Sequence, residues 1–526
     1  MTVTQVIPAV FSCLILVFYV VWNDKRLLKI PEAALYFSPK RISPTDAREL
    51  ADRLAASAPL STKEVLPPKT GRRYIIVGGG GFLGAWIAAK LLQRGENPQN
   101  IRILDLHPPA NYVVRDALAQ GLQFVKVDVT DAAATDAAFK LPWSVSVPRT
   151  GISVFHAAAN IRFFERHLEL LDRSTKVNVE GTKNVVKAAR GAGADVLVYT
   201  SSGAIGLHST RLFLWPWEKE PENFVQVIDD DDSRYPKKHE EFFSNYAASK
   251  IQGERLIRAS DKLLTGDSPG QVIRTGCIRP GNGVFGPRGD MNCGAWLVRR
   301  HNPSWAHNVV QSFNYVENCA AAHLCYEARL IELQSSTSNN PDIGGDAFVV
   351  ADPGPPPTYG DLYTIMGTMT NDECTFPYVS TTALMLLAII IETYYRFQQA
   401  LVRKGSRLAK YFPAVKGDLM AIQPSIFPLV TTHMIFDDSR ARLPPEEGGL
   451  GYTGLWTSAE GVHQTVEEFK SGVGLSDRRS NDAGFQLGFD KVRFWKAKKE
   501  GKGVELGTLS SAPMPGVIAT NVSIKV

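Results

Sequence analysis

A tyrosine and a lysine stand four residues apart in the segment YAASK, as Tyr246 and Lys250. On a helix this spacing places both side chains on one face, one turn apart. A phenol is a weak base at neutral pH because its pKa is near 10, but a nearby positive charge favours the phenolate and helps it to remove a proton from an alcohol. Ser202, which ends the segment VYTSS, could hydrogen-bond the same alcohol oxygen. The same spacing also arises by chance on solvated helices, so its meaning depends on the surrounding elements.

The segment YIIVGGGGFLG, residues 74–84, predicts a strand, a tight glycine turn and the start of a helix. Glycines allow positive φ angles and let a pyrophosphate approach the N–H groups that begin the helix. A plain turn is the alternative for such a glycine run. Asp105 favours a dinucleotide site, because it lies 21 residues after Gly84 at the end of a second apolar run, where such folds place an acid that binds the ribose hydroxyls.

Strand and helix patterns continue to alternate after Asp105, which predicts an α/β fold: a Rossmann doubly wound parallel sheet with ligands at the carboxyl ends of its strands. The predicted catalytic residues are Ser202, Tyr246 and Lys250. The predicted cofactor-binding residues are Gly78, Gly81, Phe82, Leu83, Gly84, Asp105, Asp128, Ala157, Asn178, Tyr246 and Lys250. Asp128 and Asn178 could instead be ordinary caps. No metal site is predicted, because the six cysteines show no ligand spacing and are interpreted as reduced packing residues.

Several segments, taken in order, resemble the extended short-chain dehydrogenase/reductases: GGGGFLG, VFHAAA, NVEGTKNVV, VYTSS, YAASK, RPGNGVFGPRGD and FNYVENCAAAH. Within that family the chain looks like the 3β-hydroxysteroid dehydrogenases, and most like the sterol-4α-carboxylate 3-dehydrogenases that decarboxylate their product. The resemblance runs from about Arg73 to Phe469 and implies the catalytic and cofactor roles given above. Val77 departs from it, since the family usually has threonine there.

Charge guides the prediction of the cofactor. Asp105 would repel a 2′-phosphate, and Leu106 and His107 follow it in place of the arginine common in NADP-binding relatives. We therefore predict NAD and leave NADP open. The net charge of +5, spread without long basic runs, suits an anionic membrane surface and gives no case for nucleic acid.

Two apolar segments suggest contact with a membrane. Val6–Trp22 has 17 uncharged residues, followed by Lys25 and Arg26, which predicts a single transmembrane helix with the catalytic part in the cytosol, at the endoplasmic reticulum. A buried helix is the alternative. Ala383–Ile391 is too short to cross a bilayer, and its aromatic and basic flank predicts an interfacial helix that admits substrate from the lipid. A buried core helix is again the alternative.

The predicted organisation is a membrane anchor (1–30), a linker (31–70), an NAD-binding Rossmann domain (71–280), a substrate-binding region (281–475) with an interfacial helix at about 380–404, and a polar tail (476–526). Between Ser202 and Tyr246, the aromatic segment around Trp215 and Trp217 could form a wall of the substrate pocket or a surface loop. The acidic run 229–232 is interpreted as a solvated face.

The resemblance implies NAD-dependent oxidation of the 3β-hydroxyl of a sterol or triterpenoid, with loss of carbon dioxide where C4 carries a carboxyl. A C4-methyl oxidase would then be a partner, and a homodimer is left open. Three alternatives remain: a 3β-hydroxysteroid dehydrogenase that also isomerises a Δ5 bond, a ketone reductase, and a non-catalytic NAD(H)-binding membrane scaffold.

Overall fold

The computed structural model describes residues 3–57, 62–144, 147, 150–335, 338–472 and 485–487. A seven-stranded parallel sheet organises the chain, in the order β10-β7-β5-β4-β1-β2-β3. Its strands are β1 (Arg73–Val77), β2 (Ile101–Asp105), β3 (Gln123–Lys126), β4 (Ile152–His156), β5 (Val196–Thr200), β7 (Arg274–Pro280) and β10 (Ala347–Val350). The chain builds outward from β1 to β3 and then, from β4, in the other direction. This confirms the predicted doubly wound Rossmann-like sheet.

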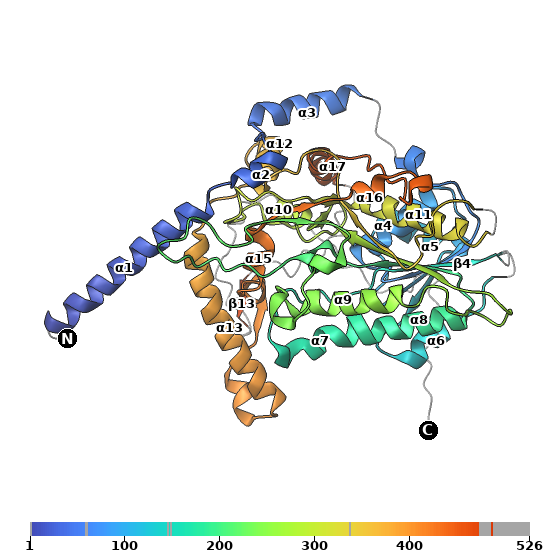
Figure 1. Ribbon diagram of the computed structural model, residues 1–526, viewed down its shortest axis with the longest axis horizontal. Helices are drawn as coiled ribbons and strands as arrows, with labels where there is room; N and C mark the ends of the chain where they lie inside the picture. Colours follow the sequence, from blue (N-terminus) through green and yellow to red (C-terminus); the bar gives the residue numbers. More distant parts are fainter. Residues whose placement is uncertain are drawn as a thin grey trace, which may run out of the picture.

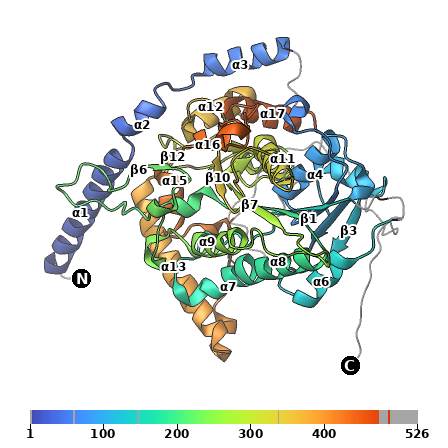
Figure 2. The ribbon, with the colours of Figure 1, turned by 45° about the vertical axis from the view of Figure 1, so that its right-hand side comes forward.

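The central strands are continuous apolar runs because helices cover both faces of the sheet. Tyr74, Ile75, Ile76 and Val77 of β1 are all fully buried. One face carries α4 (Phe82–Gln93), α5 (Tyr112–Leu118) and α11 (Val316–Glu332), and the other carries α6 (Ala132–Lys140), α7 (Leu171–Thr175), α8 (Thr182–Gly191) and α9 (Asn245–Arg258) (Figure 2). Val77 pairs with both Leu104 and His156, so the carboxyl ends of β2, β1 and β4 lie at one edge.

The C-terminal region packs beside that edge of the sheet, around a cluster of buried side chains that includes Leu297, Leu362 and Val462. Its helices are α10 (Cys293–Arg299), α12 (Tyr359–Met369), α13 (Thr381–Arg403), α14 (Asp418–Ala421), α15 (Ile426–Thr431), α16 (Ser439–Arg442) and α17 (Ser458–Lys470). Three two-stranded pairs complete it: β6 (Val225–Ile228) with β12 (His433–Phe436), β8 (Val284–Phe285) with β9 (Asn314–Tyr315), and β11 (Val415–Gly417) with β13 (Phe485–Leu487). The rest of the predicted polar tail lies outside the described residues.

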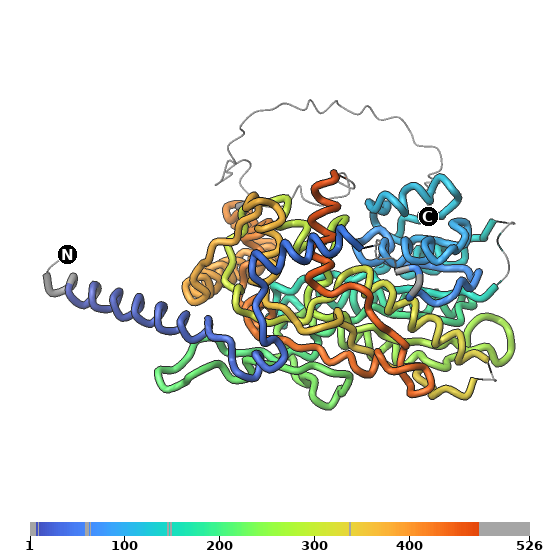
Figure 3. The backbone as a smooth tube through the Cα atoms, turned by 90° about the horizontal axis from the view of Figure 1, so that it is seen from above, coloured from blue at the N-terminus to red at the C-terminus, as the bar shows by residue number. Residues whose placement is uncertain are grey.

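The N-terminal segment begins with α1 (Val3–Leu27), which extends away from the body of the molecule (Figures 1 and 3). Among the helices described, none is both long enough and apolar enough to cross a membrane, so the transmembrane prediction for Val6–Trp22 is not confirmed. The predicted linker contains α2 (Glu32–Phe37) and α3 (Pro44–Ala56) and is tied to the C-terminal region. Arg41 pairs with Asp361 at 2.7 Å, for example.

Candidate active site

A cavity of about 2250 Å³ opens along the carboxyl ends of the central strands. Ser202, Tyr246 and Lys250 line it together with most of the predicted cofactor-binding residues: Gly78, Gly81, Phe82, Leu83, Gly84, Asp105, Asp128 and Ala157. The structure thus brings the predicted catalytic residues and the glycine turn into one space. Asn178 does not line this cavity.

The glycine turn fits a dinucleotide, because its backbone leaves no room for side chains. Gly78 has a φ of +85°, and a Cβ atom there would lie 2.5 Å from the backbone nitrogen of Ala158. A Cβ atom on Gly84 would lie 2.3 Å from the carbonyl oxygen of Gly78. Gly81 is the N-cap of α4, and the first residues of that helix line the cavity. The N–H groups of a helix's first turn have no partner within the helix and can bind an anion. A pyrophosphate would bind at this helix start.

Asp105 lies at the end of β2, and its side chain binds the backbone of the glycine turn. Its carboxylate accepts hydrogen bonds from the N–H groups of Gly80 (3.0 Å) and His107 (3.1 Å). Asp128 is exposed at the cavity edge and accepts from the N–H of Thr130 at 2.9 Å. Both carboxylates lie where the adenosine half of a dinucleotide would be held.

Asn178, the predicted cofactor-binding residue that does not line the cavity, lies inside a continuous helical segment. It sits fully buried in a π-helical turn, Lys176–Gly181, and its side chain clamps the loop after β4. Its Oδ1 accepts from the N–H of Asn160 at 2.7 Å, while its Nδ2 donates to the Asn160 carbonyl and to Ser249. These contacts give the Asn178 side chain a structural role, and the predicted cofactor contact stays a prediction.

Tyr246 and Lys250 lie one turn apart on α9, which Ser244 caps through the N–H of Ala247. Ser202 follows β5 at the start of a short 3₁₀ turn. Burial raises the pKa of Tyr246, while a hydrogen bond with the Ser202 hydroxyl lowers it. The sequence predicted that Lys250 would lower this pKa. The structure does not show that effect, because Lys250 is directed elsewhere.

Lys250 points at the end of β5. Its Nζ donates to the hydroxyl of Tyr199 and to the carbonyl of Thr200, each at 2.6 Å, and lies 4.0 Å from the centre of the Tyr199 ring. Burial lowers the pKa of Lys250 to about 7, with Cys277 and Glu254 acting in the opposite direction. Tyr199, itself fully buried, therefore helps to keep the ammonium group charged. The sequence did not indicate this role, because VLVYT has the pattern of an ordinary core strand.

Replacing Tyr199 by Phe is expected to lower kcat/KM about tenfold, since a hydrogen bond to a charged group is lost. The charged form of Lys250 loses an acceptor, so its pKa falls further, and the alkaline limb of the profile of kcat/KM against pH moves to lower pH. Tyr452→Phe is the matched control, because it removes another buried hydroxyl, bonded to the Ala351 carbonyl at 2.9 Å. An unchanged alkaline limb in the Tyr199 variant would contradict this role.

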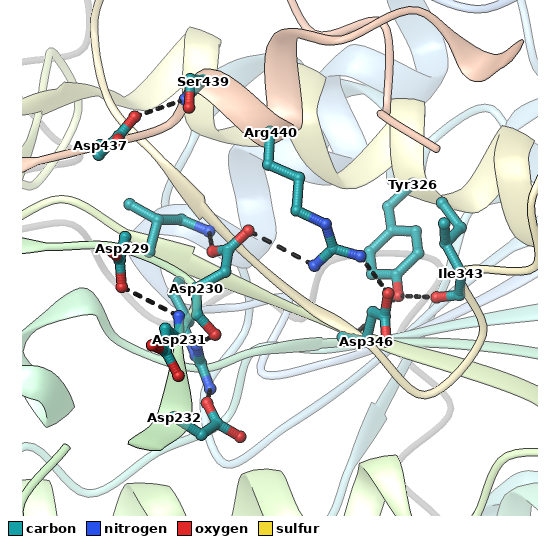
Figure 4. Close-up of polar contacts among 12 residues, drawn as sticks. Asp229, Asp230, Asp231, Asp232, Tyr326, Ile343, Asp346, Asp437, Ser439 and Arg440 are labelled. Carbon is teal, nitrogen blue, oxygen red and sulfur yellow. Dashed lines mark hydrogen bonds and ion pairs between the residues drawn. The ribbon is translucent and has the colours of Figure 1, made fainter. Parts of the chain in front are cut away.

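The acidic run 229–232 is only in part the solvated face that the sequence predicted, because Asp231 and Asp232 are exposed whereas Asp229 and Asp230 are partly buried. Asp230 is largely buried, accepts from the N–H of Val349 at 2.6 Å and faces Arg440 at 3.6 Å (Figure 4). Burial raises the pKa of Asp230 to about 6. Asp232 pairs with the fully buried Arg279. The run thus fastens the insertion after Ser202 to the edge of the sheet.

Arg279 continues this network to the active site. It donates to both carboxylate oxygens of Glu254, at 3.0 and 2.5 Å, and Glu254 also accepts from the hydroxyl of Ser201 at 2.6 Å. Arg279 and Glu254 are both fully buried. The pair holds the residue next to Ser202 and so supports the end of β5.

The other half of the cavity is mostly apolar and is lined by the C-terminal region together with the loop after β4. Its walls include Ile161, Phe163, Trp296, Trp305, Tyr359, Tyr363, Phe376, Leu384, Ile422, Ile426 and Leu429. Leu384 comes from α13, the helix predicted at about 380–404. Trp215 and Trp217 do not line the cavity and are 56% and 76% exposed, so the surface-loop alternative describes them.

Comparison with known proteins gives related chains at low identity. A 3beta-hydroxysteroid-dehydrogenase/decarboxylase, isoform 2, of Arabidopsis thaliana is 25% identical over 421 residues, which cover 76% of this chain and 62% of that protein. The decarboxylating sterol-4-alpha-carboxylate 3-dehydrogenase of Candida albicans is 27% identical over 293 residues, 53% of this chain and 70% of that one. Human 3 beta-hydroxysteroid dehydrogenase type 7 is 27% identical, with coverages of 55% and 70%.

Solved structures give a more distant likeness. A UDP-glucose 4-epimerase of Thermotoga maritima with UDP-glucose has a TM-score of 0.47 and 17% identity, covering 76% of this chain and 99% of that one. A family model provides the assignment, because the model of the 3-beta hydroxysteroid dehydrogenase/isomerase family matches residues 75–373, more than half of the chain. The chain belongs to the 3-beta hydroxysteroid dehydrogenase/isomerase family.

Proposed function

We propose that the protein uses NAD to oxidise the 3β-hydroxyl of a sterol or triterpenoid that carries a 4α-carboxyl group, and that the product then loses carbon dioxide. The observation that carries the proposal is the single cavity that joins the glycine turn, Ser202, Tyr246 and Lys250 to a large apolar pocket. The family assignment and the printed activities of the relatives from Arabidopsis and Candida support the choice of substrate.

Each of the three proposed catalytic residues has one task in the reaction. Ser202 donates a hydrogen bond that holds the oxygen, and Tyr246 removes the hydroxyl proton. Lys250, whose charge is held by Tyr199 and Thr200, would fix the ribose of the cofactor, and the positive charge of a bound nicotinamide ring would favour the phenolate. A dinucleotide held at the glycine turn would supply the acceptor for the hydride lost from C3. The apolar walls exclude water and orient the ring system.

Loss of carbon dioxide needs no further residue. Oxidation at C3 converts a 4-carboxylate into a β-keto acid. The bond between C4 and the carboxyl carbon then breaks, its electron pair passes into the C3 ketone as an enolate, and a proton from water is added at C4. A reaction that oxidises a 4-methyl group to the carboxyl must precede this step, which is why we propose a C4-methyl oxidase as a partner.

Paired substrates test this proposal. We expect a 3β-hydroxy sterol with a 4α-carboxyl to give a ketone one carbon shorter, with a kcat/KM about tenfold or more above that of the sterol lacking the carboxyl. Product analysis by mass spectrometry would identify the carbon loss. A conjugated Δ4-3-ketone from a Δ5 substrate would instead support the dehydrogenase/isomerase alternative.

We also propose that the protein works at a membrane, as expected for the endoplasmic reticulum. Apolar side chains on α1, such as Phe18, are exposed, as are Leu387 and Ile390 on α13. Lys25 and Lys29 are also exposed, and they follow the apolar part of α1, where the chain enters the body of the molecule. An apolar substrate could reach the cavity from lipid past Leu384.

Asp105 provides a test of the cofactor. Replacing Asp105 by Ser removes the carboxylate that would repel a 2′-phosphate, so the ratio of kcat/KM for NAD to that for NADP is expected to fall about tenfold. Asp128→Asn is the control, since it also removes a carboxylate from the cavity edge without changing the end of β2. A wild-type enzyme with a clear preference for NADP would contradict the choice of NAD.

A further inference from the structure

The most exposed aromatic pair on the described surface belongs to residues 211–218, here called the Trp loop. Trp215 and Trp217 stack with ring centres 5.5 Å apart and an angle of 5° between the planes. They are 56% and 76% exposed. Two large aromatic side chains stacked together in solvent are unusual on a protein surface, and such a patch typically marks an interaction site.

The Trp loop is fastened to α1 through polar contacts. The side chain of Asn23 donates to the Leu212 carbonyl and accepts from the N–H of Leu214, both at 3.1 Å. The hydroxyl of Tyr19 donates to the Leu214 carbonyl at 3.0 Å. Asn23 is fully buried, so the loop has a fixed place along α1.

The same turn of α1 also fixes the start of α13. Asn23 donates to the hydroxyl of Thr382 at 2.8 Å, and the Asp24 carboxylate accepts from the N–H and the hydroxyl of Thr382 at 2.8 and 2.6 Å. Figures 1 and 2 show α1 and α13 meeting at this point and then diverging. Three segments far apart in the sequence are thus joined at one polar clamp, formed by Asn23 and Asp24.

Apolar and basic residues are sorted on either side of this clamp. Before it, α1 presents exposed apolar side chains, with Phe18 71% exposed. After it come the exposed Lys25 and Lys29, and Arg26, which donates to the Lys219 carbonyl at 3.4 Å. Trp side chains favour the interface between hydrocarbon and headgroups, and basic residues favour anionic headgroups. The Trp loop lies at the level where such an interface would begin.

We propose that Trp215 and Trp217 dock on a lipid bilayer with anionic headgroups, as a third contact that sets the depth and orientation of α1 and α13. The inference rests on the membrane association proposed above. It also gives the clamp a function, because the clamp binds Thr382, and Leu384, two residues later, lines the active-site cavity. Docking of the Trp loop would therefore hold the α13 side of the cavity against the lipid from which an apolar substrate comes.

The test compares the full-length W215S/W217S variant with wild type on vesicles of phosphatidylcholine, with and without phosphatidylserine. We expect the double variant to bind phosphatidylserine-containing vesicles about tenfold more weakly, and W215F/W217F to retain most of the binding. L263S/L264S is the matched control, because it removes two exposed apolar side chains elsewhere on the surface and should bind like wild type.

Two results would overturn the proposal. One is equal vesicle binding by W215S/W217S and L263S/L264S. The other is a change in the oligomeric state of W215S/W217S with unchanged vesicle binding, which would assign the Trp loop to a contact between protein chains. Turnover of a detergent-dispersed substrate should be the same in all these variants, so a failure of the proposed enzymatic function would appear separately, as absent turnover in the wild type.

Discussion

Replacing Tyr246 by Phe is expected to lower kcat by about 10²–10⁴-fold, the range that a positioned proton-transfer group contributes. The variant keeps the ring, which is packed against the cluster around Ala247 and Ile251, and loses only the hydroxyl that faces Ser202. We therefore expect unchanged thermal unfolding and little change in the dissociation constant of NAD, measured by calorimetry. The loss should appear in kcat, because the missing group acts in the transition state.

The Tyr246 variant also separates catalysis from binding. If it kept more than about a tenth of the wild-type kcat, another group would have to remove the proton, and the assigned role of Tyr246 would be wrong. The kcat of Ser202→Ala should lie between that of wild type and that of Tyr246→Phe, since this variant loses a hydrogen bond to the substrate oxygen but keeps the base. If either variant lost NAD affinity by the same factor as kcat, the substitution would have damaged the cavity itself.

Replacing Arg279 by Met is expected to lower the free energy of unfolding by about 3–5 kcal/mol, because it leaves the buried Glu254 carboxylate with only the longer contact to Arg258, at 3.5 Å. Glu254 and Arg279 are both fully buried, so water cannot compensate the charge. Chemical denaturation followed by fluorescence would measure the loss. Activity should fall as well, since Glu254 holds Ser201 beside the catalytic Ser202.

Two controls distinguish an uncompensated charge from a general loss of packing. The double variant E254L/R279M removes both charges and should recover much of the stability of R279M, because a buried pair replaced by apolar groups is often nearly neutral. Arg234→Met breaks an exposed pair with Asp229, where Arg234 is 65% exposed, and should cost less than about 1 kcal/mol. If R279M were as stable as R234M, the buried network would not have the assigned importance.

The sequence predicts the elements whose signals are local. The apolar runs before Gly78 and at Ile101–Asp105 identify strands that are buried on both faces. The glycine turn identifies the start of α4 because only residues without a side chain fit that close approach. The Tyr246–Lys250 spacing is also a local signal, since one helical turn fixes the relative position of the two side chains.

The remaining features depend on contacts between segments that are distant in sequence. The acidic run 229–232 is paired because Arg279 and Val349 come to it from neighbouring strands. Asn178 serves the loop after β4 because a π-helical turn directs its side chain there. No local pattern reports these partners. The role of Tyr199 is hidden for the same reason, because a tyrosine in a core strand gives no sign that a lysine from a distant helix will reach its hydroxyl.

The most direct test of the central claim follows two products at once. The full-length enzyme in detergent would be incubated with NAD and a 3β-hydroxy-4α-carboxy sterol, and NADH and carbon dioxide would be measured together, with Y246F alongside. We predict that wild type forms the two products in equal amounts and that Y246F forms almost none of either. NADH without carbon dioxide would contradict the decarboxylating reaction, and the absence of both products with wild type would contradict the proposed dehydrogenase activity on this substrate.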